Sequence, residues 1–406
     1  MIVREFNKST KLDHVAYDVR GPVLEEADRM QAQGMEILKL NIGNPATFGF
    51  HAPGYLSRRM AAELAGADGY SDSKGILSAR QAIVGWCARK GIQGVTVNDV
   101  YTGNGVSELI TMSMQGLLSD GDEILIPAPD YPLWTAAATL AGGRVVHYLC
   151  DEASGWMPDL RDMERKITPR TKAIVLINPN NPTGALYPKA LLEGIVRLAR
   201  EYGLLLFSDE IYDRLVMDGQ THIATASLAP DVFCITFGGL SKSHRAAGWR
   251  VGWMCLSGPK THVKGYIEGL NMLSSMRLCS NVPAQHVIAP ALADESPDTD
   301  LLPGGRIYEQ REYITAAMND IPGVSAVKPS AAFYIFPKLD AKRFGIVDDE
   351  RFVLDFLREK HVLLVHGHGF HWEEPDHFRI VYLPELDVLR RSAAQLRGFL
   401  ETYRQN

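Results

Sequence analysis

A single lysine, Lys242, lies in a stretch of sequence that leaves its amine little hydration. The stretch FGGLSKSHRAAGWRVGW (237–253) surrounds it with small and apolar residues, directly after a run, 232–237, that is typical of a buried strand. An amine held there needs a compensating partner, or it takes part in chemistry as a nucleophile or as one end of a covalent bond. A lysine after a strand is usually a solvated loop residue, so the groups around it must decide.

The elements that must position this lysine form an alternating α/β pattern. Seven β-rich runs recur: DVYTG (99–103), DEILIP (122–127), RVVHYLC (144–150), KAIVLINP (172–179), LLLFSDE (204–210), DVFCITF (231–237) and RVGWMC (250–255). Several are continuously apolar, which is typical of strands covered on both faces, and apolar residues recur between them at helical spacing. We therefore expect an α/β fold with a mostly parallel seven-stranded sheet sandwiched by helices.

The pattern changes at DESPDTDLLPGG (294–305), a polar stretch rich in turn formers. Beyond it the sequence indicates an α+β arrangement, with strands at 331–337, 362–367 and 377–384 and helices near 306–320, 349–360 and 385–403. We expect a large domain over 46–300 and a smaller C-terminal domain over 301–406. The N-terminal segment, 1–45, is expected to pack with the small domain.

Ligands of a parallel sheet bind beyond the carboxyl ends of its strands, so the residues just after each run are the first candidates for a binding site. TGNGVSE (102–108) follows the first run and opens a helix. Its backbone N–H groups at Gly105, Val106 and Ser107 suit an anion at the positive end of a helix, although a tight turn explains the same residues. NPNNPTG (178–184) has the composition of a plain loop, yet it places the Asn181 amide at the end of the fourth run.

Acidic and basic side chains follow the next runs. SDEIY (208–212) ends the fifth run with Asp209, and Tyr212 comes three residues later. The apolar residues upstream favour a buried Asp209, which needs a cationic partner, over an exposed loop acid. Arg250 follows Lys242 by eight residues. An amine, an anion site, an acid and a hydroxyl donor are what an aldehyde cofactor with a phosphate tail and a pyridine ring requires.

Eight ordered pieces, spread over nearly the whole chain, carry a resemblance to a known family. They are NIGNP (41–45), GY (69–70), TGNGVSEL (102–109), PAPDYPLW (127–134), NPNNPTG (178–184), SDEIY (208–212), SKSHRAAGWRVGW (241–253) and FRIVY (378–382). In these pieces the chain resembles the pyridoxal-phosphate aminotransferases of fold type I, class I/II. The resemblance implies the PLP-dependent transferase fold and pyridoxal 5'-phosphate as cofactor.

Carried over position by position, the resemblance makes Lys242 the lysine that forms the Schiff base with the cofactor. Asp209 would pair with the protonated pyridine nitrogen, while Asn181 and Tyr212 would donate to the phenolic oxygen, and Tyr131 would stack on the ring. We therefore predict Lys242, Asp209 and Tyr212 to be catalytic. The phosphate contacts implied by the resemblance come from Gly105, Val106, Ser107 and Arg250, and from Tyr70 of a second subunit.

The resemblance also implies how the substrate is held. Arg379 would bind the α-carboxylate, helped by Asn181 and by the backbone of Gly43. The family usually has a hydroxyl residue three positions before the lysine, where this chain has Gly239. That departure puts one phosphate contact in question unless Ser241 supplies it.

Substrate choice follows from the N-terminal stretch YDVRGPVLEEADRMQAQGMEILKLNIGNP (17–45), which resembles alanine aminotransferases more than aspartate aminotransferases, particularly at VRGP (19–22). We expect L-alanine and 2-oxoglutarate to give pyruvate and L-glutamate, with an aspartate or aromatic aminotransferase as the alternative. Tyr17 and Arg20 are candidates for the substrate entrance, or else a helix cap and a surface charge. Arg277 is a candidate for the distal carboxylate of glutamate, or else a surface arginine.

Two other functions are compatible with the same scaffold. A lyase, such as an aminocyclopropane-carboxylate synthase or a C–S lyase, would use the same cofactor, since fold and cofactor do not fix the bond that is broken. A non-catalytic regulator is less favoured, because known regulators of this scaffold carry an added winged-helix domain and only about forty residues precede NIGNP.

The loop HGHGFHWEEPDHF (366–378) contains His366, His368, His371 and His377 together with three acids, a density that can bind a transition metal. The family places a glycine and a phenylalanine in this loop, here Gly367 and Phe370. We therefore expect a loop that borders the active site, and we predict no metal.

The composition favours small-molecule partners. The 406 residues have a formal net charge of −6, which indicates neither a nucleic-acid nor an anionic-membrane surface. Five scattered cysteines without a CxxC pair indicate a reducing compartment. The N-terminus lacks the apolar core of a signal peptide, and no apolar run approaches the ~18 residues of a membrane span. We expect a cytoplasmic protein and, from the shared Tyr70, a homodimer with composite active sites.

Overall fold

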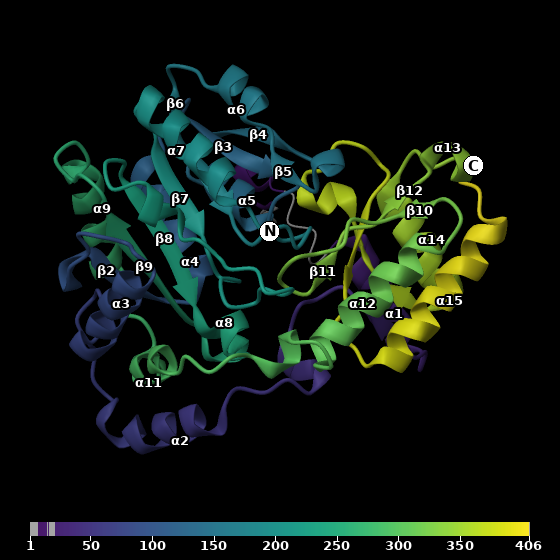
Figure 1. Ribbon diagram of the computed structural model, residues 1–406, viewed down its shortest axis with the longest axis horizontal. Coiled ribbons are helices and arrows are strands. Elements are labelled where there is room, and N and C mark those ends of the chain that lie inside the picture. The colour runs from purple at the N-terminus through teal and green to yellow at the C-terminus, as the bar shows by residue number, and fades with distance from the viewer. Residues whose placement is uncertain (1–6, 14, 16–20, 406) are drawn as a thin grey trace, which may run out of the picture.

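The computed structural model describes residues 7–13, 15 and 21–405, and its largest element is an eight-stranded sheet (Figure 1). The strand order is β2-β9-β8-β7-β6-β3-β4-β5. The strands are β2 Val100–Asn104, β3 Glu123–Ala128, β4 Arg144–Asp151, β5 Met157–Pro158, β6 Thr171–Ile177, β7 Leu205–Asp209, β8 Cys234–Gly239 and β9 Val251–Ser257. All seven predicted strands are present, and β5 adds a short eighth strand at one edge that no run in the sequence indicated.

The directions of these strands confirm the predicted mostly parallel sheet. β3 is parallel to β4 and β6, and β7 is parallel to β6 and β8. β9 runs antiparallel to both β2 and β8, so Val251 pairs with Asn104 and Gly252 pairs with Gly239. The first residues of β9 therefore lie at the same edge of the sheet as the last residues of β2 and β8.

The sheet is buried because its apolar side chains alternate between two helical layers. Ile124 and Ile126 of β3 belong to one core cluster, which also contains residues of α4 (Val106–Leu117), α5 (Leu133–Leu140) and α9 (Lys264–Met276). Leu125 belongs to the opposite cluster, with residues of α3 (Leu77–Arg89), α7 (Lys189–Tyr202) and α11 (Ile288–Ala293). Shorter or peripheral helices are α2 Gly54–Glu63, α6 Leu160–Lys166, α8 Leu240–Ser243 and α10 Val282–Gln285.

The C-terminal part, residues 306–402, has the expected α+β composition. Its helices are α12 Arg306–Asn319, α13 Ala341–Phe344, α14 Asp349–Lys360 and α15 Leu386–Thr402. A three-stranded sheet joins β11 (Tyr334–Ile335), β15 (Phe378–Val381) and β14 (Val365–His366). Two pairs complete it: β10 (Val324–Ser325) with β12 (Lys338–Leu339), and β1 (Leu38–Lys39) with β13 (Val362–Leu363). The strands β11, β13, β14 and β15 are shorter than the runs at 331–337, 362–367 and 377–384 that predicted them, and no run predicted β1, β10 or β12.

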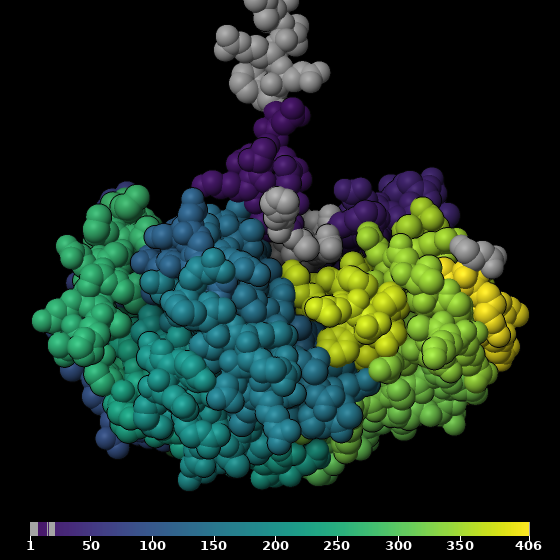
Figure 2. Space-filling model, turned by 90° about the horizontal axis from the view of Figure 1, so that it is seen from above, coloured from purple at the N-terminus to yellow at the C-terminus, as the bar shows by residue number. Residues whose placement is uncertain are grey.

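The N-terminal elements α1 (Pro22–Ala32) and β1 contact this C-terminal part, whereas the short helix Thr10–Leu12 contacts α5 of the large sheet region. Helix α1 begins with a proline at its first position and packs against α14, while β1 pairs with β13. Figure 2 shows α1, in purple, against the green and yellow C-terminal part. The exact division into 1–45, 46–300 and 301–406 stays a prediction. Within the described residues, no helix is long and apolar enough to cross a membrane.

Candidate active site

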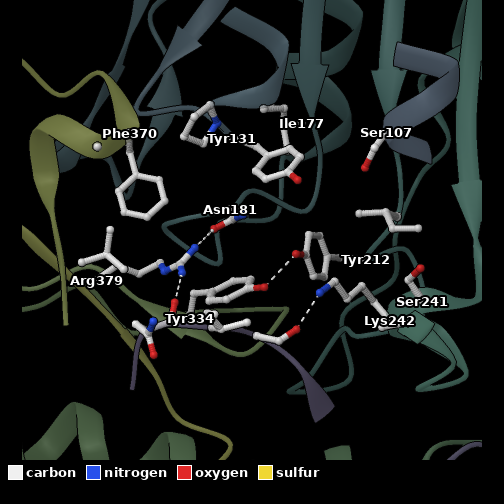
Figure 3. A pocket seen from close by; sticks show the side chains of 18 of the residues that line it. Ser107, Tyr131, Ile177, Asn181, Tyr212, Ser241, Lys242, Tyr334, Phe370 and Arg379 are labelled. Carbon is white, nitrogen blue, oxygen red and sulfur yellow. Dashed lines mark hydrogen bonds between the residues drawn. The ribbon is translucent and has the colours of Figure 1, made fainter. Parts of the chain in front are cut away.

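A cavity of about 300 Å³ lies where the carboxyl ends of the strands face the C-terminal part (Figure 3). It is lined by most of the predicted site residues, namely Gly43, Val106, Ser107, Tyr131, Asn181, Asp209, Tyr212, Lys242, Arg250 and Arg379. Parallel strands end at the same edge of a sheet, which explains how segments so far apart in sequence meet here.

Lys242 reaches the cavity from α8, the short helix that follows β8. Its Nζ donates a 2.6 Å hydrogen bond to the backbone oxygen of Gly43 (Figure 3). The same Nζ lies 5.9 Å from the centre of the Phe333 ring. A neutral acceptor holds the amine, and no described carboxylate forms an ion pair with it. The amine can therefore leave this hydrogen bond to react with a carbonyl group.

Asp209 is the last residue of β7 and is 3% exposed. Its Oδ2 accepts a hydrogen bond from Trp134 Nε1 at 3.1 Å, and its Oδ1 accepts one from the Ile211 amide at 3.3 Å. Burial raises the pKa of this carboxyl to about 6, although both hydrogen bonds favour the ionised form. The cationic partner that the sequence led us to expect is absent from the described residues, so a bound cationic group would stabilise the carboxylate.

The end of the cavity beside α4 and Arg250 can bind an anion. Val106 and Ser107 begin α4, whose first N–H groups have no partner inside the helix. Gly105 before them has a φ of +81°, and a Cβ there would collide with the guanidinium of Arg250. Arg250 itself has a φ of +55°, an uncommon conformation for a residue other than glycine, and donates to the Ala247 carbonyl at 2.9 Å. Its charge is thereby fixed beside the helix terminus.

The structure explains why a glycine, Gly239, stands where the family usually has a hydroxyl residue. A Cβ at this position would collide with the backbone oxygen of Val251 and crowd the side chain of Ile211, so no larger residue fits. Ser241, two residues on, lines the cavity next to Lys242 (Figure 3). A hydroxyl is thus present at this end of the cavity, from a different position than in the family pattern.

Arg379 lies in β15, buried at the far side of the cavity with 8% exposure. Its guanidinium donates to Asn181 Oδ1 at 2.9 Å and to the backbone oxygen of Asn41 (Figure 3). Burial lowers the pKa of this guanidinium below its ordinary value. Its Nε is buried and finds no hydrogen-bond acceptor among the described residues. A buried guanidinium whose Nε–H has no acceptor among the described residues suits a carboxylate ligand.

Tyr334 is a residue of this site that the sequence did not single out. Its hydroxyl forms a 2.9 Å hydrogen bond with the Tyr212 hydroxyl, and the Arg379 guanidinium lies 4.7 Å from the centre of its ring. A Cβ at Gly43 would overlap the Tyr334 hydroxyl, so the glycine makes room for it. In AAFYIFP (331–337), Tyr334 is one aromatic residue in a strand-like run, and nothing local distinguishes it.

Some predicted or candidate residues lie elsewhere. Tyr70 is 80% exposed and does not line the cavity of its own chain. Arg277 is no surface arginine: it forms an ion pair with Glu108 and donates to the Thr102 carbonyl at 2.6 Å, outside the cavity. This arginine is therefore already occupied and does not offer a site for a distal carboxylate. Tyr17 and Arg20 fall outside the described residues.

The histidine-rich loop does not gather its imidazoles at one point. His366 and His368 face Asp349, with His368 Nδ1 at 2.7 Å from that carboxylate. His371 Nδ1 lies 2.7 Å from Asp130, whereas His377 Nδ1 lies 2.6 Å from Asp376. Phe370 and His366 line the cavity, so the loop borders the site as expected.

Comparison with known proteins places the chain in a family. The model of the aminotransferases of class I and II matches residues 36–392, and the chain belongs to that family. Glutamate-pyruvate aminotransferase AlaA of Haemophilus influenzae is 57% identical over 404 residues, covering 99% of this chain and 100% of that protein. Alanine aminotransferase of Mycobacterium tuberculosis is 54% identical over 404 residues, covering 99% and 94%.

A solved structure agrees with these relatives. The crystal structure of an aminotransferase from Escherichia coli has a TM-score of 0.98 to this chain at 57% identity, covering 99% of this chain and 100% of that one. The predicted class I/II family, its fold type I and the closeness to alanine aminotransferases are thereby confirmed.

Proposed function

We propose that this chain binds pyridoxal 5'-phosphate in the cavity and transfers an amino group between L-alanine and 2-oxoglutarate, giving pyruvate and L-glutamate. The observation that carries the proposal is the convergence of four groups on one cavity: the Lys242 amine, the buried Asp209 carboxylate, the Arg250 anion site and the Arg379 guanidinium. The names of the relatives support the substrate pair. A cytoplasmic location, expected from the sequence, belongs to the same proposal.

The residues fit this cofactor at three points. The start of α4 and Arg250 offer hydrogen bonds and charge to a phosphate. Asp209 is a buried carboxyl without a described cation, and a protonated ring nitrogen would supply one. Lys242 lines the same cavity, where its amine would meet an aldehyde. Tyr131, Asn181 and Tyr212 line the same space and would contact the ring.

The residues then have separate tasks. Bound pyridoxal phosphate supplies an aldehyde that holds the substrate amine and an electron-poor ring that stabilises charge at the α-carbon. Lys242 Nζ acts as the general base that removes the α-proton, and its ammonium form then acts as the general acid that returns a proton. Asp209, oriented by Trp134, would keep the nitrogen of the cofactor ring protonated. Arg379, fixed by Asn181, grips the substrate α-carboxylate and sets the α-carbon before the lysine.

Replacing the carboxylate arginine tests that last task. We expect Arg379→Lys to raise KM for both L-alanine and 2-oxoglutarate by about 10- to 100-fold, because an ammonium cannot reproduce the planar two-point contact. Steady-state kinetics with each substrate varied in turn measures the change. Arg397→Lys is the control: Arg397 belongs to α15 and forms an exposed ion pair with Asp320, so its replacement should leave KM unchanged. Equal KM values for Arg379→Lys and the unmodified protein would remove Arg379 from the substrate site.

The products of the reaction distinguish the proposed function from its rivals. Incubation with L-alanine and 2-oxoglutarate should give pyruvate and L-glutamate in equal amounts. Ammonia release without L-glutamate would instead show a lyase, and a much higher kcat/KM for aspartate or an aromatic amino acid would reassign the donor. A panel of amino acids against pyruvate and 2-oxoglutarate covers these outcomes in one experiment.

A homodimer is part of the same proposal. Tyr70 is exposed, and so are three apolar side chains nearby in the structure, Leu77 at 53%, Met276 at 78% and Leu278 at 51%. The segment that separates Tyr70 from Leu77 is tied to the end of α9, where Ser274 Oγ donates to the Ser73 carbonyl at 2.7 Å. An exposed apolar area of this kind favours a protein partner, and a second copy would bring its Tyr70 to the phosphate end.

Subunit mixing tests the shared site. Tyr70→Ala and Lys242→Ala should each be poorly active alone, whereas mixed and re-equilibrated subunits should regain activity, because one of the two heterodimer sites keeps both residues. Mass spectrometry of the mixture verifies that heterodimers form. If heterodimers are abundant and activity stays at the level of the parents, Tyr70 does not act across the interface.

A further inference from the structure

The loop that carries Phe370 is tied to the rest of the molecule by two histidines with different partners. The loop comprises helix η10, Gly367–Phe370, and His371. His368 pairs with Asp349, which belongs to α14 of the same C-terminal part. His371 pairs with Asp130, which follows β3 of the large sheet, and so joins the two parts of the molecule.

Asp130 holds the loop at two points. Its backbone N–H donates to the Phe370 carbonyl at 3.0 Å, and its Oδ1 lies 2.7 Å from His371 Nδ1. The carboxylate is fully buried, and its Oδ2 accepts a 2.7 Å hydrogen bond from the Thr135 hydroxyl. The Thr135 hydrogen bond thus holds the Asp130 carboxylate in place, and this carboxylate can in turn hold His371 and its loop.

Both ends of this contact lead directly into the cavity. Asp130 is followed in sequence by Tyr131, which lines the cavity on the side of the sheet. His371 is preceded by Phe370, whose ring centre lies 4.6 Å from the Arg379 guanidinium. The Arg379 charge is therefore sandwiched between Phe370 and Tyr334, and the position of Phe370 depends on the loop.

We infer that Asp130 and His371 are positioning residues, a clasp that holds Phe370 against Arg379 and thereby sets the carboxylate-binding guanidinium. The inference rests on the proposed function, since it assigns substrate carboxylate binding to Arg379. Neither residue of the clasp lines the cavity, so both act through their neighbours.

A metal site made by the same residues does not fit the geometry. Asp130, His147 and His371 place ligand atoms within 4.8 Å of one another. The His147 and His371 rings are stacked, however, with centroids 4.8 Å apart and only 22° between their planes. A metal binds an imidazole nitrogen in the plane of the ring, and one ion cannot lie in two nearly parallel planes. The stack instead supports His371 from the side of β4.

The loop offers its own matched control. We expect His371→Ala to raise KM for L-alanine about tenfold with kcat changed less than about threefold, because the lost clasp weakens carboxylate binding. His368→Ala removes a histidine–aspartate pair from the same loop without touching Asp130, and should change KM less than about twofold. His371→Gln, which keeps an N–H donor, should restore part of the loss, and Asp130→Asn combined with His371→Ala should be no worse than His371→Ala alone.

A binding measurement separates this inference from the proposed function. The dissociation constant of propanoate, a carboxylate without an amino group, is measured by NMR on the purified holoprotein and needs no turnover. His371→Ala should weaken propanoate binding about tenfold relative to His368→Ala. Equal effects of the two variants, or a fall in kcat with KM and propanoate binding unchanged, would overturn the clasp. Absence of transamination in the unmodified protein would instead overturn the proposed function.

Discussion

Lys242→Ala should lower the turnover of L-alanine with 2-oxoglutarate by about 10³-fold or more. In the proposed function the lysine amine both anchors the aldehyde and moves the α-proton, and general acid–base catalysis alone contributes about 10²- to 10⁴-fold. The side chain is only partly buried, and its hydrogen bond to Gly43 is local, so the fold should survive the change. Coupled assays for pyruvate and L-glutamate measure the loss.

A surface lysine provides the control for this prediction. Lys189→Ala removes an exposed lysine on α7 that pairs with Glu193 and should leave turnover unchanged. Thermal unfolding of both variants verifies that each is folded. A folded Lys242→Ala protein that keeps more than about a tenth of the turnover would show that another group does the proton transfer.

Asp209→Asn should have opposite effects on stability and on activity. In the cofactor-free protein, burial raises the pKa of Asp209 from its usual 3.8 to about 6. The folded state therefore binds the Asp209 proton more tightly than the unfolded state does. The resulting contribution to the free energy of unfolding is fully present below pH 3.8 and is lost as pH rises through about 6. At about pH 8 the ionised carboxylate costs roughly 3 kcal/mol, which asparagine avoids.

We therefore expect cofactor-free Asp209→Asn to resist urea better than the unmodified protein at about pH 8, with the difference fading near pH 4. Turnover should fall by about 10²- to 10³-fold, because no carboxylate remains to hold a proton on the cofactor ring. Glu210→Gln is the matched control: Glu210 is also fully buried with a pKa raised to about 7 by burial, yet it does not line the cavity. Similar losses of turnover in both variants would contradict the role given to Asp209.

Strand ends were the feature of this sequence that predicted the site best. The β-rich runs identified seven strands of the sheet, and residues at or just beyond their ends, such as Asp209 and Asn181, line the cavity because parallel strands share an edge. The same rule explains Lys242. Turn formers and apolar runs are local signals that mark where each strand ends, and the common edge of parallel strands then brings these ends together.

Residues set by distant contacts could not be predicted in this way. Tyr334 meets Tyr212 from another part of the chain, and its run reads as an ordinary aromatic strand. The two-residue strand β5 is too short for a period, and the antiparallel direction of β9, which brings Arg250 to the site, depends on pairing with β2 and β8. Arg277 was open to two readings because its partner, Glu108, lies far away in sequence.

The proposed function requires a covalent bond between one lysine and one aldehyde. Reduction of the purified holoprotein with borohydride, followed by digestion and mass spectrometry, locates that bond directly. We expect a pyridoxyl group on the peptide that contains Lys242 and on no other lysine peptide. A modified lysine elsewhere, or none in a protein that transaminates L-alanine, would contradict this expectation.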